Sequence, residues 1–204
     1  MKVGPKYKIC KRLGASVFEK CQTQKFQLAE ARAPRKISRG KRGGSSDFGA
    51  QLLEKQKARF TYGLSESQFA RYVSEAMEKR GQDSITGLMA RLESRLDNAV
   101  FRAGFVKTRR AARQLVSHGH VRVNGRRITI PSYHVAVGDK VDIRPESRTS
   151  PLFTNRSEVA AETKLPEWLV MGGEHFEVEV VKNPLVADTE LPFNAGVVIQ
   201  FYSR

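Results

Sequence analysis

The sequence predicts an α+β protein. A mainly helical domain carries an inserted small α+β domain of helices plus antiparallel sheet, and an extended basic N-terminal arm precedes both. Apolar residues recur at helical spacing through residues 47–116 and alternate at strand spacing through 121–143, whereas residues 1–46 keep neither period. We therefore expect the arm at 1–46, the helical domain at 47–87 completed by 146–204, and the small domain at 88–145.

Positive charge is concentrated in two segments. The 204 residues carry a formal net charge of +15, divided as +12 over residues 1–60, −1 over 61–88, +8 over 89–145 and −4 over 146–204. Self-repulsion of this size destabilises a compact free protein, so we expect a polyanionic partner, with nucleic acid favoured over a membrane surface. The chain has no run of 18 apolar residues and no apolar signal core, which predicts a soluble, cytoplasmic protein without a membrane partner.

The basic N-terminal arm ends in the run SRGKRGGSS, and its charge density leads us to expect order only on a polyanion. It holds both cysteines of the chain, Cys10 and Cys21, with no histidine nearby. Two thiols cannot make a four-ligand zinc site, and a disulfide would need an oxidising compartment that no other feature supports. We therefore expect two reduced thiols, no metal and no cofactor.

Two helices are expected at the start of the helical domain. Ser46 or Asp47 can cap the first, which ends near Gly63. The second begins with a capping box over Ser65–Gln68, and its apolar stripe predicts core packing. The apolar C-terminal stretch 196–204 is expected to return to this domain, because a free apolar tail would favour aggregation.

A third helix is expected over residues 84–103, where Gly104 stops it. Apolar residues at i, i+4 spacing give this helix a buried side. Arg91, Arg95 and Arg102 lie on the other side, where we expect them to be free to meet phosphate.

The stretch TRRAARQLVSHGHVRVNGRRI, residues 108–128, predicts a helix followed by a hairpin. Thr108 can cap the helix, Gly119 can end it, and Asn124–Gly125 is a strong signal for a two-residue hairpin turn. The stretch holds six arginines and no lysine, and the planar group of arginine can grip phosphate at two points. We therefore predict one cationic face built from the helix and the hairpin.

Weaker signals complete the small domain and the segment after it. Two short strands are expected near 133–135 and 141–143, and another near 176–180.

No constellation for catalysis is visible. The sequence lacks a phosphate-binding glycine loop, a dinucleotide turn and a nucleophile elbow. His118 and His120 could act as acid, base or metal ligands, but they fit RNA contact or a helix end better. We expect a non-enzymatic binder of structured RNA, since the hairpin does not suit the major groove of DNA. A single-strand binder would need exposed aromatic residues beside the basic groove.

Two sets of residues resemble known families. The stretch SRLDNAVFRAGFVKTRRAARQLVSHGHVRVNGRRITIPSYHVAVGDKV resembles the S-four RNA-binding domain, a module that also occurs in pseudouridine synthases, tyrosine-tRNA ligases and a ribosome-binding heat-shock protein. The flanking stretches GPKYK, SDFGAQLLEKQKARFTYGLSESQFARYV, LPEWL and QFYSR resemble the bacterial-type small-subunit ribosomal protein S-four family. The resemblance covers nearly the whole chain.

This resemblance implies a structural constituent of the small ribosomal subunit that acts in translation. Members are primary binders of small-subunit ribosomal RNA that nucleate ribosome assembly and contribute to decoding accuracy. Implied partners are that RNA, ribosomal protein S-five and other small-subunit proteins, and messenger RNA near the channel through which it enters. The alternative is an RNA-modifying enzyme or an RNA-binding ribosome-rescue factor with the same module. Such an enzyme would need a catalytic domain of about a hundred residues or more, which the 59 residues after 145 cannot supply.

The charge pattern and this resemblance together give the residues that we expect to contact RNA. In the arm these are Lys8, Lys11, Arg12, Arg35, Lys36, Arg39, Lys41 and Arg42, and in the helical domain Lys55, Lys57, Arg59 and Arg71. In the small domain they are Arg95, Arg102, Lys107, Arg109, Arg110, Arg113, Gln114, His118, His120, Arg122, Asn124, Arg126 and Arg127. Many members hold zinc with four cysteines in the arm, so the two cysteines here imply a metal-free arm. Gln200 stands where members often have glutamate, which changes the charge of that interface.

Overall fold

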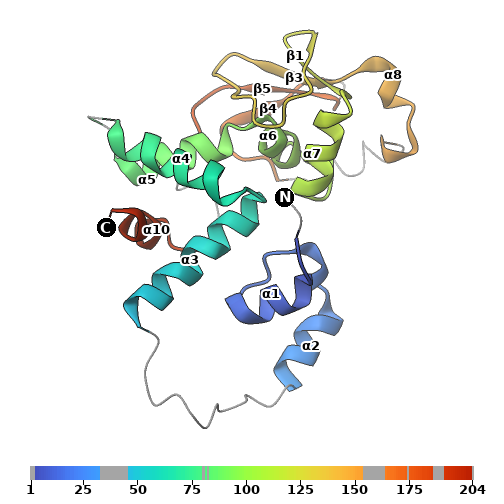
Figure 1. Cartoon of the computed structure of the whole chain (residues 1–204). Coiled ribbons are helices and arrows are strands. Elements are labelled where there is room, and N and C mark those ends of the chain that lie inside the picture. The colour runs from blue at the N-terminus through green and yellow to red at the C-terminus, as the bar shows by residue number, and fades with distance from the viewer. Residues whose placement is uncertain are drawn as a thin grey trace. The chain divides into compact units, whose positions relative to one another are not determined.

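The protein divides into two compact units (Figure 1). The computed structural model describes residues 3–32, 46–79, 81, 83–153, 164–173, 175–185 and 191–203. Residues 1–80 and 190–204 form one unit, the helical unit, and residues 81–189 form the other, the sheet unit. The α+β class predicted from the sequence is confirmed, because helices occur in both units and the sheet unit contains a five-stranded sheet.

The N-terminal segment of the helical unit is folded into helices. They are α1 (Lys6–Leu13), the 3-10 helix η1 (Glu19–Cys21) and α2 (Gln24–Arg32). Over residues 3–32 the prediction of an extended arm is therefore wrong. A small buried cluster of Cys10, Cys21 and Phe26, with Phe18 packed against it, supplies the tertiary contacts that hold these short elements together.

The prediction of two reduced thiols is also wrong, because Cys10 and Cys21 form a disulfide. Gly14 ends α1 with a left-handed φ of 62° and turns the chain back, so that η1 lies beside α1. Both cysteines are buried. The spacing of the cysteines in the sequence does not reveal this reversal.

Among its described residues, the helical unit has three further helices: α3 (Asp47–Tyr62), α4 (Glu66–Glu78) and α10 (Ala195–Tyr202). The predicted caps are present, since the side chains of Ser46 and Ser65 accept hydrogen bonds from the backbone N–H groups of Gly49 and Gln68. The C-terminal stretch returns as expected, and α10 packs against α3 and α4. Its Tyr202 ring lies 6.1 Å from the Phe69 ring, centroid to centroid.

The sheet unit begins with two helices, α5 (Ser84–Glu93) and α6 (Leu96–Arg102), where the sequence predicts one. The helix breaks because Arg95 adopts an extended conformation, with φ −68° and ψ 139°. The backbone N–H of Leu96 donates to the carbonyl of Tyr133 (2.8 Å) instead of continuing the helix. A contact between segments distant in sequence therefore sets the break.

The sheet has the order β2-β1-β3-β5-β4, and every neighbouring pair is antiparallel. Its strands are β1 (Val121–Val123), β2 (Arg126–Arg127), β3 (Lys140–Ile143), β4 (Leu169–Met171) and β5 (Glu177–Val180). The predicted hairpin is present, and Asn124 (φ 50°) and Gly125 (φ 77°) both take the positive φ that a type I′ turn requires. The strand expected near 133–135 is only an isolated bridge between Arg95 and His134.

The boundary expected after residue 145 is wrong. After α8 (Pro145–Arg148) and the 3-10 helix η2 (Pro151–Phe153), strands β4 and β5 extend the sheet from its β3 side. Val178 pairs with Val141 across β5 and β3, so these strands belong to the sheet unit and do not complete the helical one. The strand expected near 176–180 is present as β5, but the sequence does not indicate β4 or the pairing with β3 that assigns both strands to the sheet unit.

The core of the sheet unit lies between the sheet and helices α6 and α7 (Arg109–Ser117), which cover one face of it (Figure 1). Val100 and Val116 from the helices pack with Val121 and Ile143 from the strands. Trp168 is fully buried in the same cluster. Helix α7 begins where predicted, because the Thr108 hydroxyl accepts from the backbone N–H of Ala111. No helix in the described residues is long and apolar enough to span a membrane.

Candidate nucleic-acid interface

A fully buried carboxylate, that of Glu93 at the end of α5, organises one side of the cationic region. The Nε of Arg102 donates to Glu93 Oε2 at 2.8 Å, and the Nδ2 of Asn98 donates to the same oxygen at 2.8 Å. Asn98 in turn accepts from the Nε of Arg109 at 2.8 Å, and the Arg109 guanidinium lies 4.0 Å from Glu93 Oε1. The same guanidinium sits over the Phe101 ring, 4.4 Å from its centroid.

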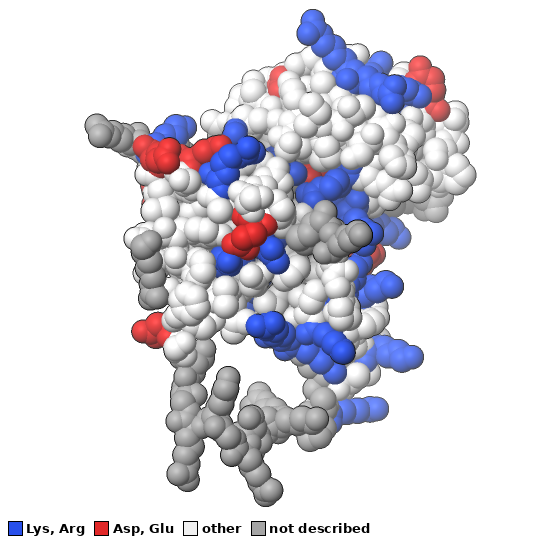
Figure 2. Space-filling view, in the orientation of Figure 1, with Lys and Arg blue, Asp and Glu red and all other residues white. Residues whose placement is uncertain are grey.

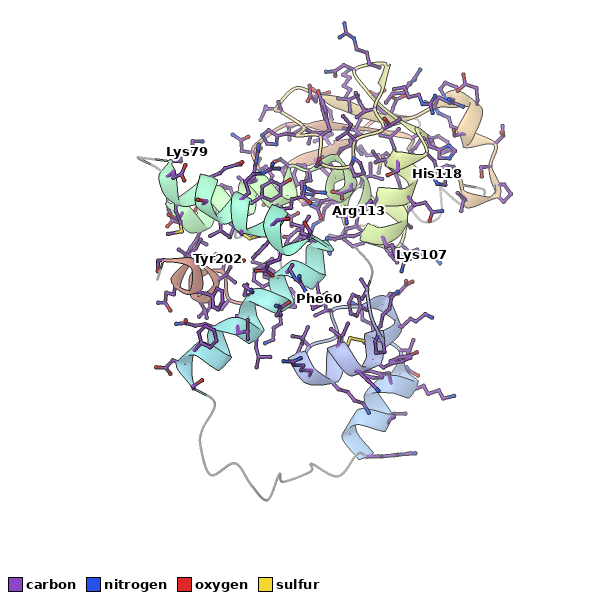
Figure 3. The ribbon with its side chains drawn as sticks, viewed as in Figure 1. Phe60, Lys79, Lys107, Arg113, His118 and Tyr202 are labelled. Carbon is purple, nitrogen blue, oxygen red and sulfur yellow. A yellow bond between two sulfur atoms is a disulfide. The ribbon has the colours of Figure 1, made fainter. Side chains whose placement is uncertain are left out.

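A second buried carboxylate, that of Asp97 in α6, holds two further arginines. Arg95 donates to it through Nε (3.0 Å) and Nη2 (2.7 Å). Arg113 of α7 donates to Asp97 Oδ2 through Nε (2.8 Å) and Nη2 (2.7 Å). Glu93 and Asp97 thus join α5, α6 and α7 through charge-assisted hydrogen bonds, and Figure 3 shows Arg113 on the side of α7 that faces α6.

The arginines of this network differ in exposure. The side chains of Arg102, Arg109 and Arg113 are 21%, 22% and 31% exposed, so each keeps part of its surface toward solvent. Arg95 is only 3% exposed. The expectation that Arg95 lies on a free face is therefore wrong, because the helix break turns its side chain inward onto Asp97.

A more exposed row runs along α7. Arg110, Gln114 and His118 are exposed and follow i, i+4, i+8 spacing, which places them on one side of the helix. Arg110 makes no ion pair with any described residue. Lys107 and His118 mark the two ends of the helix in Figure 3. Arg110 therefore presents its charge, and Gln114 and His118 their polar groups, on a side of α7 where a polyanion could bind.

The hairpin adds arginines next to the end of α7. Arg126 and Arg127 of β2 are exposed, and Arg127 donates to the carbonyl of His118 at 3.4 Å. Its guanidinium lies where a Cβ at residue 119 would be, so Gly119 leaves room for the Arg127 side chain to pack against the end of α7. Arg127 thus links the hairpin to the end of α7. We refer to the exposed residues of these two elements as the cationic face: Arg110, Gln114, His118, Arg126 and Arg127.

His120 borders this face and is partly buried. Its Nδ1 lies 2.9 Å from the Ser147 hydroxyl, and its ring centroid is 6.0 Å from that of His118. Burial first, and then the charges of His118, Arg144 and Arg127, lower the pKa of His120. The neutral imidazole is therefore favoured in the free protein, and a phosphate nearby would oppose that shift.

Two other expected contacts are used inside the protein. Arg122 pairs with Asp142 directly opposite it on β3, and this hydrogen bond raises the pKa of Arg122. The Asn124 amide donates to Asp139 (2.8 Å) and accepts from the backbone N–H of Lys140 (2.9 Å). Asn124 ties the hairpin turn to the start of β3, and Arg122 is balanced by a carboxylate.

Comparison with known proteins agrees with this architecture. The family model of the ribosomal protein S4/S9 N-terminal domain matches residues 2–93, and that of the S4 domain matches residues 94–141. The small ribosomal subunit protein uS4 of Natranaerobius thermophilus is 42% identical over 207 residues, which cover 98% of each chain. The uS4 proteins of Roseiflexus castenholzii (99% of this chain, 98% of its own) and Persephonella marina (98% of each) are both 43% identical.

The chain belongs to the uS4 family. The family membership expected from the sequence is therefore confirmed. The two uS4 family models meet between residues 93 and 94, where α5 ends and the chain turns into α6. Strands β4 and β5 lie beyond the residues that the S4 domain model matches.

In the helical unit of this uS4 chain, each of the four expected contact residues lies near a carboxylate. Lys55 is buried and donates to Glu66 at 2.6 Å, so its ammonium group is engaged inside the protein and its contact with RNA stays a prediction. Arg59 lies 3.5 Å from the same carboxylate, and Lys57 pairs with Glu54 at 2.6 Å. Arg71, whose side chain is 65% exposed, is the most accessible of the four.

The N-terminal helices of the uS4 chain carry exposed cations. Lys8, Lys11 and Arg12 project from α1, and Figure 2 shows lysine and arginine side chains dominating the surface over α1 and α2. The remaining arm residues expected to contact RNA lie outside the described residues: Arg35, Lys36, Arg39, Lys41 and Arg42. In the described part of the chain, no group of three or more histidine, cysteine or acidic residues could hold a metal ion.

The sequence pattern did not identify the buried acceptors of this network. Glu93, Asp97 and Asn98 are buried polar residues that the pattern places on a helix interior without a role. One signal was available, because Glu93 and Asp97 stand four residues apart, at the spacing of neighbours on a helix surface, with arginines before, between and after them.

Proposed function

We propose that this chain is a structural, non-enzymatic protein of the small ribosomal subunit that binds small-subunit ribosomal RNA and resides in the ribosome. Its uS4 relatives carry names of small-subunit proteins. The observation that carries the RNA-binding role is the cationic face, whose Arg127, from the β1–β2 hairpin, packs against the end of α7 beside Gly119. Guanidinium groups grip phosphate at two points, so this face suits the backbone of folded RNA.

The finer roles rest on the family resemblance. We propose that the chain is a primary RNA binder that nucleates subunit assembly, lies next to ribosomal protein S-five and contributes to decoding accuracy. We also propose that basic residues of the arm contact messenger RNA near the channel through which it enters. The exposed cations of α1 are compatible with an arm that follows a polyanion. No specific observation favours a modifying enzyme or a ribosome-rescue factor.

The test is the salt dependence of binding to a folded small-subunit ribosomal RNA transcript. If 6 to 10 phosphates are contacted, the affinity should fall by about 10³- to 10⁵-fold between 50 and 200 mM salt. The double variant Arg110→Gln, Arg126→Gln should lower the salt slope by about two, because each arginine neutralises about one phosphate.

A matched control is the double variant Lys164→Gln, Lys182→Gln, which removes the same charge from residues outside the cationic face. It should leave the salt slope nearly unchanged. Equal slopes for the two double variants would show that net charge alone drives binding, and the assignment of the cationic face would then be wrong. A footprint of the protein on the transcript would identify the RNA segment that it covers.

A further inference from the structure

Buried carboxylates are unexpected in a unit whose surface is strongly basic. Glu93 is fully buried and Asp97 is 3% exposed. Burying a charge is costly unless it is paired, and replacing buried ion pairs by apolar side chains is often neutral or stabilising. Stability alone therefore does not explain why acidic residues occupy these positions.

The geometry of the pairs gives another reason. Arg102, Arg109 and Arg113 come from two helices, yet all three are directed by Glu93, Asp97 and Asn98. Each keeps between a fifth and a third of its side chain exposed. A guanidinium has five N–H donors in one plane, so it can bind a carboxylate at one edge and a phosphate at another.

We propose that Glu93 and Asp97 are positioning residues for RNA recognition. They hold Arg102, Arg109 and Arg113 in fixed directions, beside the cationic face on α7, and so favour a polyanion with fixed phosphate spacing. The ligand class selected in this way is folded RNA, as opposed to an unstructured strand. This inference rests on the proposed function, namely that the sheet unit binds ribosomal RNA.

An arginine that is held in place before binding contributes more to the affinity for a rigid ligand than a mobile arginine does. Immobilising a long side chain on association costs about two- to twelvefold in affinity, a cost that is avoided when the side chain is already held. A flexible strand gains less, because it can adapt its own phosphates to mobile side chains. The carboxylates therefore reduce the net charge of the unit but increase its selectivity.

Positioning and electrostatics alone predict opposite changes in RNA affinity when the charge of Asp97 is removed. Removing the Asp97 charge makes the protein more positive, so charge alone predicts tighter binding to every polyanion. Positioning predicts weaker binding to folded RNA, because Arg113 loses the carboxylate that directs it. The experiment should therefore change the positioning while keeping the net charge constant.

The double variant Arg95→Met, Asp97→Asn does this in the full chain, because it removes one buried charge of each sign. The probes are a folded small-subunit ribosomal RNA transcript and poly-uridylate at equal phosphate concentration. We expect the affinity for the folded transcript to fall about tenfold and that for poly-uridylate to change less than twofold, from loss of one fixed arginine. Trp168 fluorescence and circular dichroism report whether the sheet unit stays folded.

A double-mutant cycle adds a readout that a purely structural role would not move. Arg113→Gln should weaken binding to the folded transcript about tenfold in the wild-type chain, but less than twofold in the Arg95→Met, Asp97→Asn background. Additive losses would overturn the proposal, as would an unchanged ratio of the two affinities. If wild-type protein does not prefer the folded transcript, the proposed function itself fails.

If the double variant unfolds, a second pair of variants decides the matter. Arg113→Lys keeps the charge and leaves Arg95 and Asp97 in place, but lacks the fork that Asp97 holds. Arg110→Lys, on the same helix, is the matched control and should lower the two affinities by the same factor. Arg113→Lys should lower only the affinity for the folded transcript; equal effects of both variants on the affinity ratio would overturn the proposal.

Discussion

Glu66, the first residue of α4, shows how one side chain joins three helices of the helical unit. It accepts hydrogen bonds from Lys55 of α3 (2.6 Å) and from the Tyr202 hydroxyl of α10 (2.9 Å), and Arg59 lies 3.5 Å away. Burial alone would raise the pKa of Glu66, but the hydrogen bonds from Lys55 and Tyr202 and the nearby charges outweigh it and lower the pKa. Burial and the bond to Glu66 raise the pKa of Tyr202.

Replacing Glu66 by glutamine should therefore have a pH-dependent effect on stability. The folded-state pKa lies below the ordinary value of 4.5, so the stabilisation is present above that pH and is lost as the pH falls through the folded pKa. Because Glu66 is partly exposed, we expect Glu66→Gln to cost up to about 1 kcal/mol at neutral pH. Denaturant unfolding as a function of pH measures this difference.

The control is Glu75→Gln on the exposed side of α4, where an Arg71–Glu75 pair spans 3.6 Å. It should have a smaller effect at every pH, since exposed pairs contribute little. A constant cost of Glu66→Gln from neutral pH to below pH 4.5 would show that the ionised carboxylate is not what stabilises the three helices.

At the scale of elements, capping residues could be predicted and breaks could not. The side chains of Ser46, Ser65 and Thr108 each accept the backbone hydrogen bond that the sequence predicts, because a cap depends on residues only three positions apart. The break between α5 and α6 depends on a carbonyl at Tyr133, and the folding of the arm depends on a pair of cysteines that meet across a reversal. Neither the helix break nor the meeting of the cysteines is indicated by residues that are close neighbours in the sequence.

The disulfide should be the main constraint on α1 and η1, since their buried cluster is small. Linking residues at a sequence separation of 11 stabilises by about 2–3 kcal/mol in the chain-entropy picture. Reduction with dithiothreitol should therefore speed amide exchange in α1, measured by hydrogen–deuterium exchange. The double variant Cys10→Ser, Cys21→Ser should show the faster exchange with or without the reductant. Slow exchange in the double variant would show that packing alone orders this segment.

At the scale of the whole molecule, the chain divides into two compact units. Trp168, the single tryptophan, lies in the core of the sheet unit, so its fluorescence reports on that unit. The helical unit depends on α10, whose Val198 is fully buried. Trp168 fluorescence can therefore follow the sheet unit, while a substitution in α10 perturbs the helical unit.

Introducing a buried charge with Val198→Asp should destabilise the helical unit by about 3 kcal/mol or more. Circular dichroism should then show loss of helix at lower denaturant, while the Trp168 fluorescence transition stays at its wild-type midpoint. Gln200→Asp, on the exposed side of the same helix, is the control and should shift neither transition appreciably. A common shift of both signals would show that the units unfold as one cooperative body.

The sequence by itself determined the α+β class, the main caps, the hairpin turn, the basic character of α7 and the family. These features depend on residue type and on spacings of a few residues, which a linear reading preserves. Only the tertiary structure decided that β4 and β5 complete the sheet, that Cys10 meets Cys21, and that Arg95, Arg113 and Asp97 form one buried network. Those contacts join segments that are distant in sequence, or depend on a helix break set from a distance, and their energy appears only when folding removes charges and apolar groups from water.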